Sequence, residues 1–172
     1  KHYSTLSSAD FIVEKGLSVL PEYSYINLSG MTFTSSPEDA SNYHSYLEYL
    51  NDNNDNTSWE PAGAKELTTY TLTLNLKTTK DLHGLKLVQT YFDNVNKRSW
   101  CPQSVKIYVS TDGVKWDVAT YVEELEIGHS TGEVNIIPFI EGGVQAQYVK
   151  VLVPTPHSES TYNISLAEIG LY

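Results

Sequence analysis

The sequence predicts an all-β protein, an antiparallel sandwich or barrel, from two observations. Apolar and polar residues alternate with a period of two through several short segments, so one face of each segment lies in a core and the other in solvent. Turn-forming residues separate these segments, as in antiparallel β-proteins. The 172 residues, 40% hydrophobic and 19% charged, have a globular composition and are enough for one core.

The clearest strand is predicted over residues 70–77, where Tyr and Leu alternate with Thr, Asn and Lys. The same reasoning predicts strands over residues 85–87, 105–109, 149–153 and 164–171. The pair Asp112-Gly113 predicts a hairpin that leads from residue 110 into Val114-Lys115-Trp116. Short helical turns are expected within residues 7–19 and 43–50. Residues 1–29 lack clean alternation and are interpreted as a linker or an extension packing on the domain, which spans residues 30–172.

The charge balance limits the partners. The chain has 21 Asp and Glu against 11 Lys and Arg, a formal net charge of -10. Nucleic acid and anionic membrane surfaces both require a basic face, so neither is expected as a partner. No apolar run approaches the roughly 20 residues of a membrane span. Cys101 is the single cysteine, so no internal disulfide forms.

Catalytic motifs are missing from the sequence. It has no Gly-x-Ser-x-Gly elbow and no His-Glu-x-x-His motif, and its five histidines are scattered. Glycosidase chemistry needs two carboxylates facing each other across a cleft, which a small sandwich rarely provides. We therefore expect that the chain is not an enzyme.

The loop Asp52–Trp59 concentrates oxygen-bearing side chains and ends in a large aromatic residue. Two interpretations are open from the residues alone. Ca²⁺ takes six to eight oxygen ligands, which such a loop supplies from carboxylates, amides, hydroxyls and carbonyls. Alternatively, Asp52 and Asn54 only cap a tight turn, as Asp and Asn often do.

Several motifs fall in the order seen in one family. They are Thr34-Ser35-Ser36, the loop ending Thr57-Ser58-Trp59, the strand Tyr70–Leu76, the hairpin segment Val105–Trp116 and the C-terminal Leu166–Tyr172. From about residue 31 to the end, the chain resembles the discoidin domain, also called the coagulation factor 5/8 type C domain. The bacterial sugar-binding members of that family form carbohydrate-binding module family 32. The resemblance implies a galactose-binding-like jelly-roll β-sandwich of about eight antiparallel strands.

The resemblance also implies a structural Ca²⁺ that joins the Asp/Asn loop to the last strand. The implied ligands are side-chain oxygens of Asp52, Thr57 and Glu168 and backbone carbonyls of Tyr49, Asn54, Thr57 and Ala167. Asn53 stands where the family usually has Gly. Asn tolerates left-handed backbone better than most residues, so the turn is expected to form. Trp59 and Trp116 are expected to pack against the sandwich.

In the family, ligands meet loops at one end of the sandwich, which correspond here to residues 41–46, 91–100 and 154–163. Sugar recognition joins an aromatic face to placed hydrogen-bonding groups. The resemblance implies as ligand residues His44, Asn94, Asn96, Arg98, Trp100 and Tyr162. Each also has an ordinary interpretation, such as a surface ion pair for Arg98 or burial for Trp100.

The expected function is that of a non-catalytic carbohydrate-binding module in a secreted or cell-surface bacterial protein. A galactose-type mono- or oligosaccharide is the expected glycan, and neighbouring domains of a larger protein are expected partners. The extracellular or cell-surface location is implied by the resemblance alone. The first residues do not have the pattern of a signal peptide, so they give no separate indication of export. The alternative is a structural or protein-interaction domain without a sugar ligand.

Overall fold

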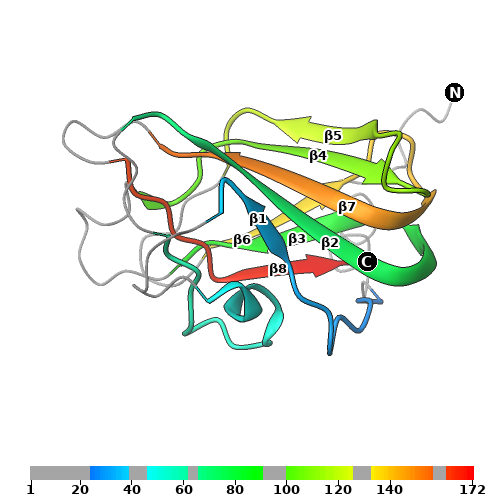
Figure 1. The fold of residues 1–172 in the computed structure, drawn as a ribbon, viewed down its shortest axis with the longest axis horizontal. Helices are drawn as coiled ribbons and strands as arrows, with labels where there is room; N and C mark the ends of the chain where they lie inside the picture. Colours follow the sequence, from blue (N-terminus) through cyan, green and yellow to red (C-terminus); the bar gives the residue numbers. More distant parts are fainter. Residues whose placement is uncertain (1–23, 39–45, 62–65, 91–99, 126–132, 157–161) are drawn as a thin grey trace, which may run out of the picture.

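Two antiparallel β-sheets packed around one hydrophobic core make up the fold (Figure 1). The computed structural model describes residues 24–38, 46–61, 66–90, 100–125, 133–156 and 162–172. The strands are β1 (Thr34–Ser36), β2 (Thr69–Leu82), β3 (Gly84–Val88), β4 (Val105–Ser110), β5 (Asp117–Val122), β6 (Val134–Pro138), β7 (Val144–Pro154) and β8 (Glu168–Leu171). A 3-10 helix, η1, spans Leu47–Asn51. One sheet has the order β1-β2-β7-β4-β5 and the other β6-β3-β8. The predicted sandwich of about eight antiparallel strands is confirmed.

The core follows from the alternation in the sequence. In β2, Leu72, Leu74 and Leu76 are buried, and the Thr and Asn residues between them are partly exposed. Burying each such leucine contributes about 1.5–3 kcal/mol relative to leaving it exposed. Side chains from both sheets fill the space between them, including Leu85 of β3 and Val151 of β7. The inner faces of the two sheets therefore interdigitate to form the core.

The predicted strands are all present, but their lengths differ. β2 extends to Leu82 because its pairing with β7 resumes at Lys80 after an irregularity that begins at Asn75. The Asp112-Gly113 turn lies between β4 and β5 as predicted, with Gly113 at φ +74°. The second strand begins only at Asp117, so Val114-Lys115-Trp116 belongs to the connection and not to the strand. β6 was not predicted. Within the predicted helical segment 43–50, the described part forms η1, while the segment 7–19 lies outside the described residues.

A segment that precedes the first strand packs against the last one. Ile26 donates a backbone hydrogen bond to the Leu171 carbonyl at 2.8 Å, and Leu28 belongs to the core. The Asn51 amide nitrogen bonds the carbonyls of Leu28 and Met31 at 3.1 and 2.8 Å, which ties this segment to η1. The domain boundary at residue 30 stays a prediction, because residues 1–23 are not among those described. Among the described residues, no helix has the length and apolarity required to cross a bilayer.

Gly84 lies where β3 begins beside the C-terminus, and replacing it with alanine is expected to destabilise the fold. An added Cβ would overlap the Tyr172 ring and lie 2.7 Å from the Ile137 carbonyl oxygen, which is backbone and cannot turn away. Overpacking of this kind costs about 1–3 kcal/mol. Thermal unfolding followed by circular dichroism measures it.

Gly170→Ala is the matched control, because Gly170 lies in β8 with its nearest neighbour, the Lys86 Cβ, at an ordinary 3.5 Å. Its stability should change by no more than about 0.5 kcal/mol. Equal effects of the two substitutions would contradict the close approach at Gly84.

Candidate functional site

The oxygen-rich loop forms a tight turn held by its own side chains. One Asp52 carboxylate oxygen accepts the Asn54 amide at 2.9 Å, and the other accepts the Thr57 hydroxyl at 2.8 Å. The Asn54 carbonyl lies 2.8 Å from the same hydroxyl and accepts the Thr57 amide at 3.0 Å. These contacts gather a carboxylate, a hydroxyl and a carbonyl within one turn, with Asp52 and Asn54 exposed to solvent.

Glu168, at the start of β8, meets this loop from the far end of the chain. Its carboxylate accepts the Asn54 amide at 3.1 Å, and the residue is only 6% exposed. Burial, followed by the neighbouring Asp52 carboxyl, raises the pKa of Glu168 to about 7. Among the described residues, no lysine, arginine or histidine forms an ion pair with Glu168. Two carboxyl groups therefore share a site, and neither forms an ion pair with a described cationic side chain.

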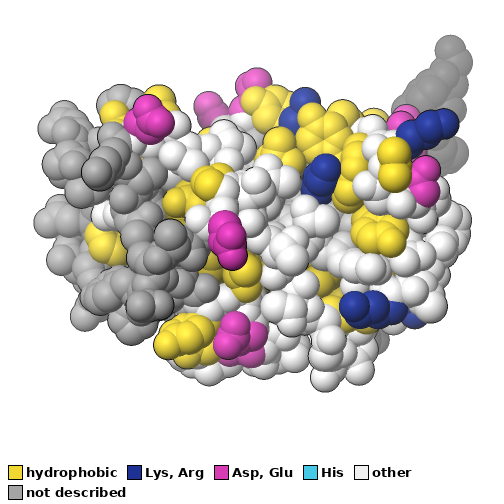
Figure 2. Space-filling view, viewed as in Figure 1, with side chains coloured by type: hydrophobic (Ala, Val, Ile, Leu, Met, Phe, Trp, Pro, Cys, Tyr) yellow, Lys and Arg dark blue, Asp and Glu magenta, His cyan; other side chains and the backbone are white. Residues whose placement is uncertain are grey.

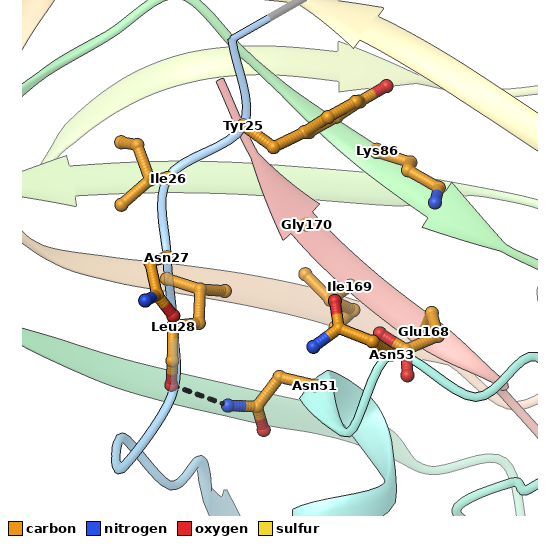
Figure 3. A pocket seen from close by; sticks show the side chains of 10 residues that line it. All are labelled: Tyr25, Ile26, Asn27, Leu28, Asn51, Asn53, Lys86, Glu168, Ile169 and Gly170. Atoms are coloured by element: carbon orange, nitrogen blue, oxygen red, sulfur yellow. Dashed lines mark hydrogen bonds between the residues drawn. The ribbon is translucent and has the colours of Figure 1, made fainter.

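The backbone around the loop accommodates this arrangement. Asn53 has φ +61°, the left-handed conformation that was expected to be tolerated there. Figure 3 shows Asn53 beside Glu168 at one side of a pocket of about 140 Å³, with the segment from Tyr25 to Leu28 on the other side. Trp59 closes the loop by a two-way backbone bridge to Leu166, two residues before Glu168. The loop and the last strand are thus fixed next to each other.

The donor chemistry of this site fits Ca²⁺. The possible ligand groups gathered here are the carboxyls of Asp52 and Glu168, the Thr57 hydroxyl and the Asn54 carbonyl, and all of them would bind through oxygen. Ala167 lies directly before Glu168 and is fully buried, and Tyr49 lies in η1 just before the loop. In the described part of the chain no three His, Cys, Asp or Glu side chains cluster at metal-binding distance, so carbonyls and hydroxyls would have to complete the shell.

Most of the predicted ligand residues lie outside the part of the chain that the structure describes. His44, Asn94, Asn96 and Arg98 lie outside the described residues. Trp100 and Tyr162 are described, and both are half-buried. The Ser165 amide donates to the Trp100 carbonyl at 2.9 Å, which joins the segments that carry these two aromatic residues. This bond joins the last residue of the predicted loop 91–100 to a residue just after the predicted loop 154–163.

The family follows from the sequence match and agrees with this geometry. The sequence profile of the F5/8 type C domain matches residues 32–168. The chain belongs to the F5/8 type C domain family. A comparison with curated proteins gave no match to this F5/8 type C domain.

Solved structures share the fold of this F5/8 type C domain. A carbohydrate-binding module, CBM32-3, from a family 31 glycoside hydrolase of Clostridium perfringens aligns with a TM-score of 0.67 and 21% identity, over 86% of this chain and 94% of that one. The family 32 module of C. perfringens NanJ, in complex with galactose, gives 0.63 and 15%, over 86% and 96%. Chitosan-binding module 1 of a Paenibacillus sp. IK-5 chitosanase/glucanase gives 0.61 and 21%, over 86% and 98%. The chain therefore has the fold of family 32 carbohydrate-binding modules.

A polar network that was not predicted links residues just after the Asp/Asn loop, just after β3 and just before β8 of the F5/8 type C domain. Thr90 and Ser165 bond through their hydroxyls at 2.6 Å, and the Ser165 hydroxyl reaches a Glu60 carboxylate oxygen at 3.1 Å. Gln89, 1% exposed, donates to the Pro102 carbonyl at 2.8 Å. The one available signal was the polar pair Gln89-Thr90 directly after the apolar β3. The network connects the segment after the Asp/Asn loop to the segments before Glu168 and after β3.

Proposed function

We propose that this F5/8 type C domain is a non-catalytic carbohydrate-binding module that recognises a glycan through the loops around residues 41–46, 91–100 and 154–163. The supporting observation is the family membership together with the fold shared with modules solved as sugar complexes. The module of NanJ is in complex with galactose, and another C. perfringens module is in complex with GalNAc-β-1,3-galactose. A galactose-type glycan is accordingly the proposed ligand class.

Half-buried Trp100 and Tyr162 are the aromatic groups proposed to contact the sugar. An aromatic ring recognises the apolar C–H face of a pyranose, and neighbouring polar side chains recognise its hydroxyls. Arg98, Asn94, Asn96 and His44 are the proposed polar partners. Arg offers a planar set of donors, while Asn both donates and accepts. One small site of this kind binds weakly, with a Kd of about 1 μM to 1 mM.

Ca²⁺ is proposed as a structural ion rather than as part of the sugar site. Asp52 and Glu168 would neutralise the dication, and the Thr57 hydroxyl with the carbonyls of Tyr49, Asn54, Thr57 and Ala167 would complete its shell. When bound, the ion supplies positive charge between two carboxylates and links the loop to β8. The related modules come from larger proteins such as a family 31 glycoside hydrolase and a chitosanase/glucanase. By analogy, this domain is proposed to be part of a larger protein at or outside the cell surface.

The test of the proposed function is a glycan array followed by calorimetric titration with Ca²⁺ present. Binding to a galactose- or N-acetylgalactosamine-containing oligosaccharide is expected. The combined change Arg98→Ala and Trp100→Ala should weaken it at least about tenfold, which is about 1.4 kcal/mol. The control Lys115→Ala, on the exposed β4–β5 turn, should leave binding unchanged.

The absence of glycan binding by the folded domain would overturn the proposal. The alternative, a protein-interaction or spacer domain, would then be the better account. Retention of glycan by the Arg98→Ala, Trp100→Ala variant would instead move the site away from these loops.

A further inference from the structure

The outer face of the five-stranded sheet carries a cluster of aromatic and lysine side chains that the proposed loop site does not include. In β4 and β7, Ile107 and Val151 point into the core, so the residues on either side of each face solvent. Figure 2 shows yellow hydrophobic side chains gathered around dark blue lysines over these strands. We call this cluster the aromatic–lysine face, and its members are Lys106, Tyr108, Trp116, Tyr148, Lys150 and Leu152.

Strand pairing sets these side chains beside one another. Tyr108 lies opposite Lys150, and Lys106 lies opposite Leu152. Cross-strand neighbours of this kind are about 4.5–5.5 Å apart at their Cβ atoms. Trp116, which lies in the β4–β5 connection, packs edge-on against the Tyr148 ring, with 6.4 Å between centroids. The face is therefore a connected surface rather than a set of isolated side chains.

The face is hollowed at its centre. Thr71, Tyr108, Trp116, Lys150 and Leu152 line an open depression of about 220 Å³. Leu152 and the ring of Tyr108 provide apolar surface, the Thr71 hydroxyl provides a donor and acceptor, and Lys150 provides a charge. This is the combination of apolar wall and few polar groups that small-molecule sites share.

The two lysines lie over aromatic rings and have no carboxylate partner in the described part of the chain. The Lys150 ammonium lies 3.9 Å from the centroid of Trp116, and that of Lys106 lies 5.1 Å from the centroid of Tyr108. Neither lysine makes an ion pair with any described acidic residue. In a chain with a formal net charge of -10, unpaired lysines on one sheet face form a local positive region. An anionic ligand group would meet an ammonium already positioned by its ring contact, which lowers the ordering cost of binding.

The strand order and the number of lysines exclude several classes of ligand for this face. β4 lies between β7 and β5, and β7 lies between β2 and β4, so ladder bonds use their backbone groups on both sides. An extended peptide that binds by adding a strand finds no free edge on this face. Two lysines are too few for the phosphate contacts of a nucleic acid or for the cluster of about four to eight basic residues that recognises an anionic lipid surface.

We propose that the aromatic–lysine face is a second glycan site, specific for a saccharide that carries a carboxylate, that is, a uronic acid unit. The carboxylate bonds the Lys150 ammonium in a charge-assisted hydrogen bond. The sugar ring lies on Tyr108 and Leu152 in the depression. Lys106, whose ammonium lies over the Tyr108 ring, extends the positive region toward a second uronate of the saccharide. This site is separate from the loop site and does not depend on it.

The experiment is calorimetric titration of the domain with three probes at low salt: oligogalacturonate, oligomannuronate and a hyaluronan hexasaccharide. Binding of at least one is expected, and its carboxyl-reduced form should bind at least about tenfold more weakly, because the ion pair is lost. Lys150→Met, which keeps the aliphatic stem, should weaken binding by a similar factor. Lys86→Met is the matched control, because Lys86 lies over the Tyr25 ring at 5.5 Å on the other sheet. It should bind the uronate within about twofold of the parent, because Lys86 lies on the other sheet and makes no contact with the proposed site; repeating the titration at about 0.15 M salt, where the Debye length is about 8 Å, removes the remaining long-range effect of its charge.

Two further measurements show whether uronate binds at the aromatic–lysine face or at the loop site. In a ¹H–¹⁵N spectrum, the indole signal of Trp116 should shift on uronate addition, while that of fully buried Trp59 should not. The Arg98→Ala, Trp100→Ala variant should bind uronate normally, so failure of the loop site and failure of this site are distinguishable. The proposal is overturned if no probe binds, if carboxyl reduction has no effect, or if Lys150→Met and Lys86→Met behave alike.

Discussion

Replacing Trp59 with alanine is expected to lower the free energy of unfolding by about 3–5 kcal/mol, the range for removing a large aromatic side chain from a core. Trp59 is fully buried and packs edge-on against Tyr70, with centroids 5.3 Å apart and planes at 87°. Its backbone is bridged to Leu166, so the cavity would open where the Asp/Asn loop joins the segment before β8. For a domain of this size the loss corresponds to a fall in Tm of roughly 6–20 °C.

Trp116→Ala is the control, since it removes the same side chain from a half-exposed position. Its loss is expected to be about 1–2 kcal/mol, from the contacts with Tyr148 and Lys150. Urea unfolding followed by circular dichroism measures both variants without depending on tryptophan fluorescence. A Trp59 variant no less stable than the Trp116 variant would show that Trp59 does not anchor the loop.

Trp59→Phe gives a second measure of the same site. The indole N–H of Trp59 is buried, and no described group accepts its hydrogen bond. A buried donor without an acceptor lowers stability, and phenylalanine removes it while retaining much of the apolar volume. The cost of Trp59→Phe should therefore be less than half of that of Trp59→Ala.

Period-two alternation was sufficient to predict the central strands, because β2, β4 and β7 each have one buried face. It failed at β6, where Asn135 occupies a buried position and Pro138 ends the strand. A buried Asn breaks the apolar pattern from which a strand is predicted. What identifies β6 is its pairing with β3, such as Leu85 with Ile137, and this contact is far apart in the sequence.

The candidate site shows the same limit. Nothing in the loop itself indicates that Glu168, 114 residues beyond Asn54, accepts the Asn54 amide. The resemblance to a family supplied that pairing, and the structure brings the two residues together. The network of Glu60, Thr90 and Ser165 was not predicted, since hydroxyl residues near strand ends are common and their partners depend on tertiary packing.

Removing calcium is expected to produce the second large effect on stability. An ion that binds only the folded state stabilises it by about 2.7 kcal/mol when its free concentration is 100 times Kd. For this domain that amounts to a rise in Tm of roughly 5–10 °C relative to the chelated protein. Thermal unfolding in excess Ca²⁺ and in excess EDTA measures the difference, and elemental analysis of the dialysed protein measures the bound metal.

Single substitutions test whether Asp52 and Glu168 both bind the ion. Glu168→Gln retains an oxygen for the Asn54 amide but removes the charge, so the folded domain should form while its response to Ca²⁺ disappears. Asp52→Asn should act in the same way. Asp55→Asn is the control, because Asp55 is an exposed acidic residue of the same loop. If Asp55→Asn abolishes the response and Glu168→Gln does not, the ion is held by the exposed turn alone. The joining of the loop to β8 then rests on the Asn54–Glu168 hydrogen bond and on the bridge between Trp59 and Leu166.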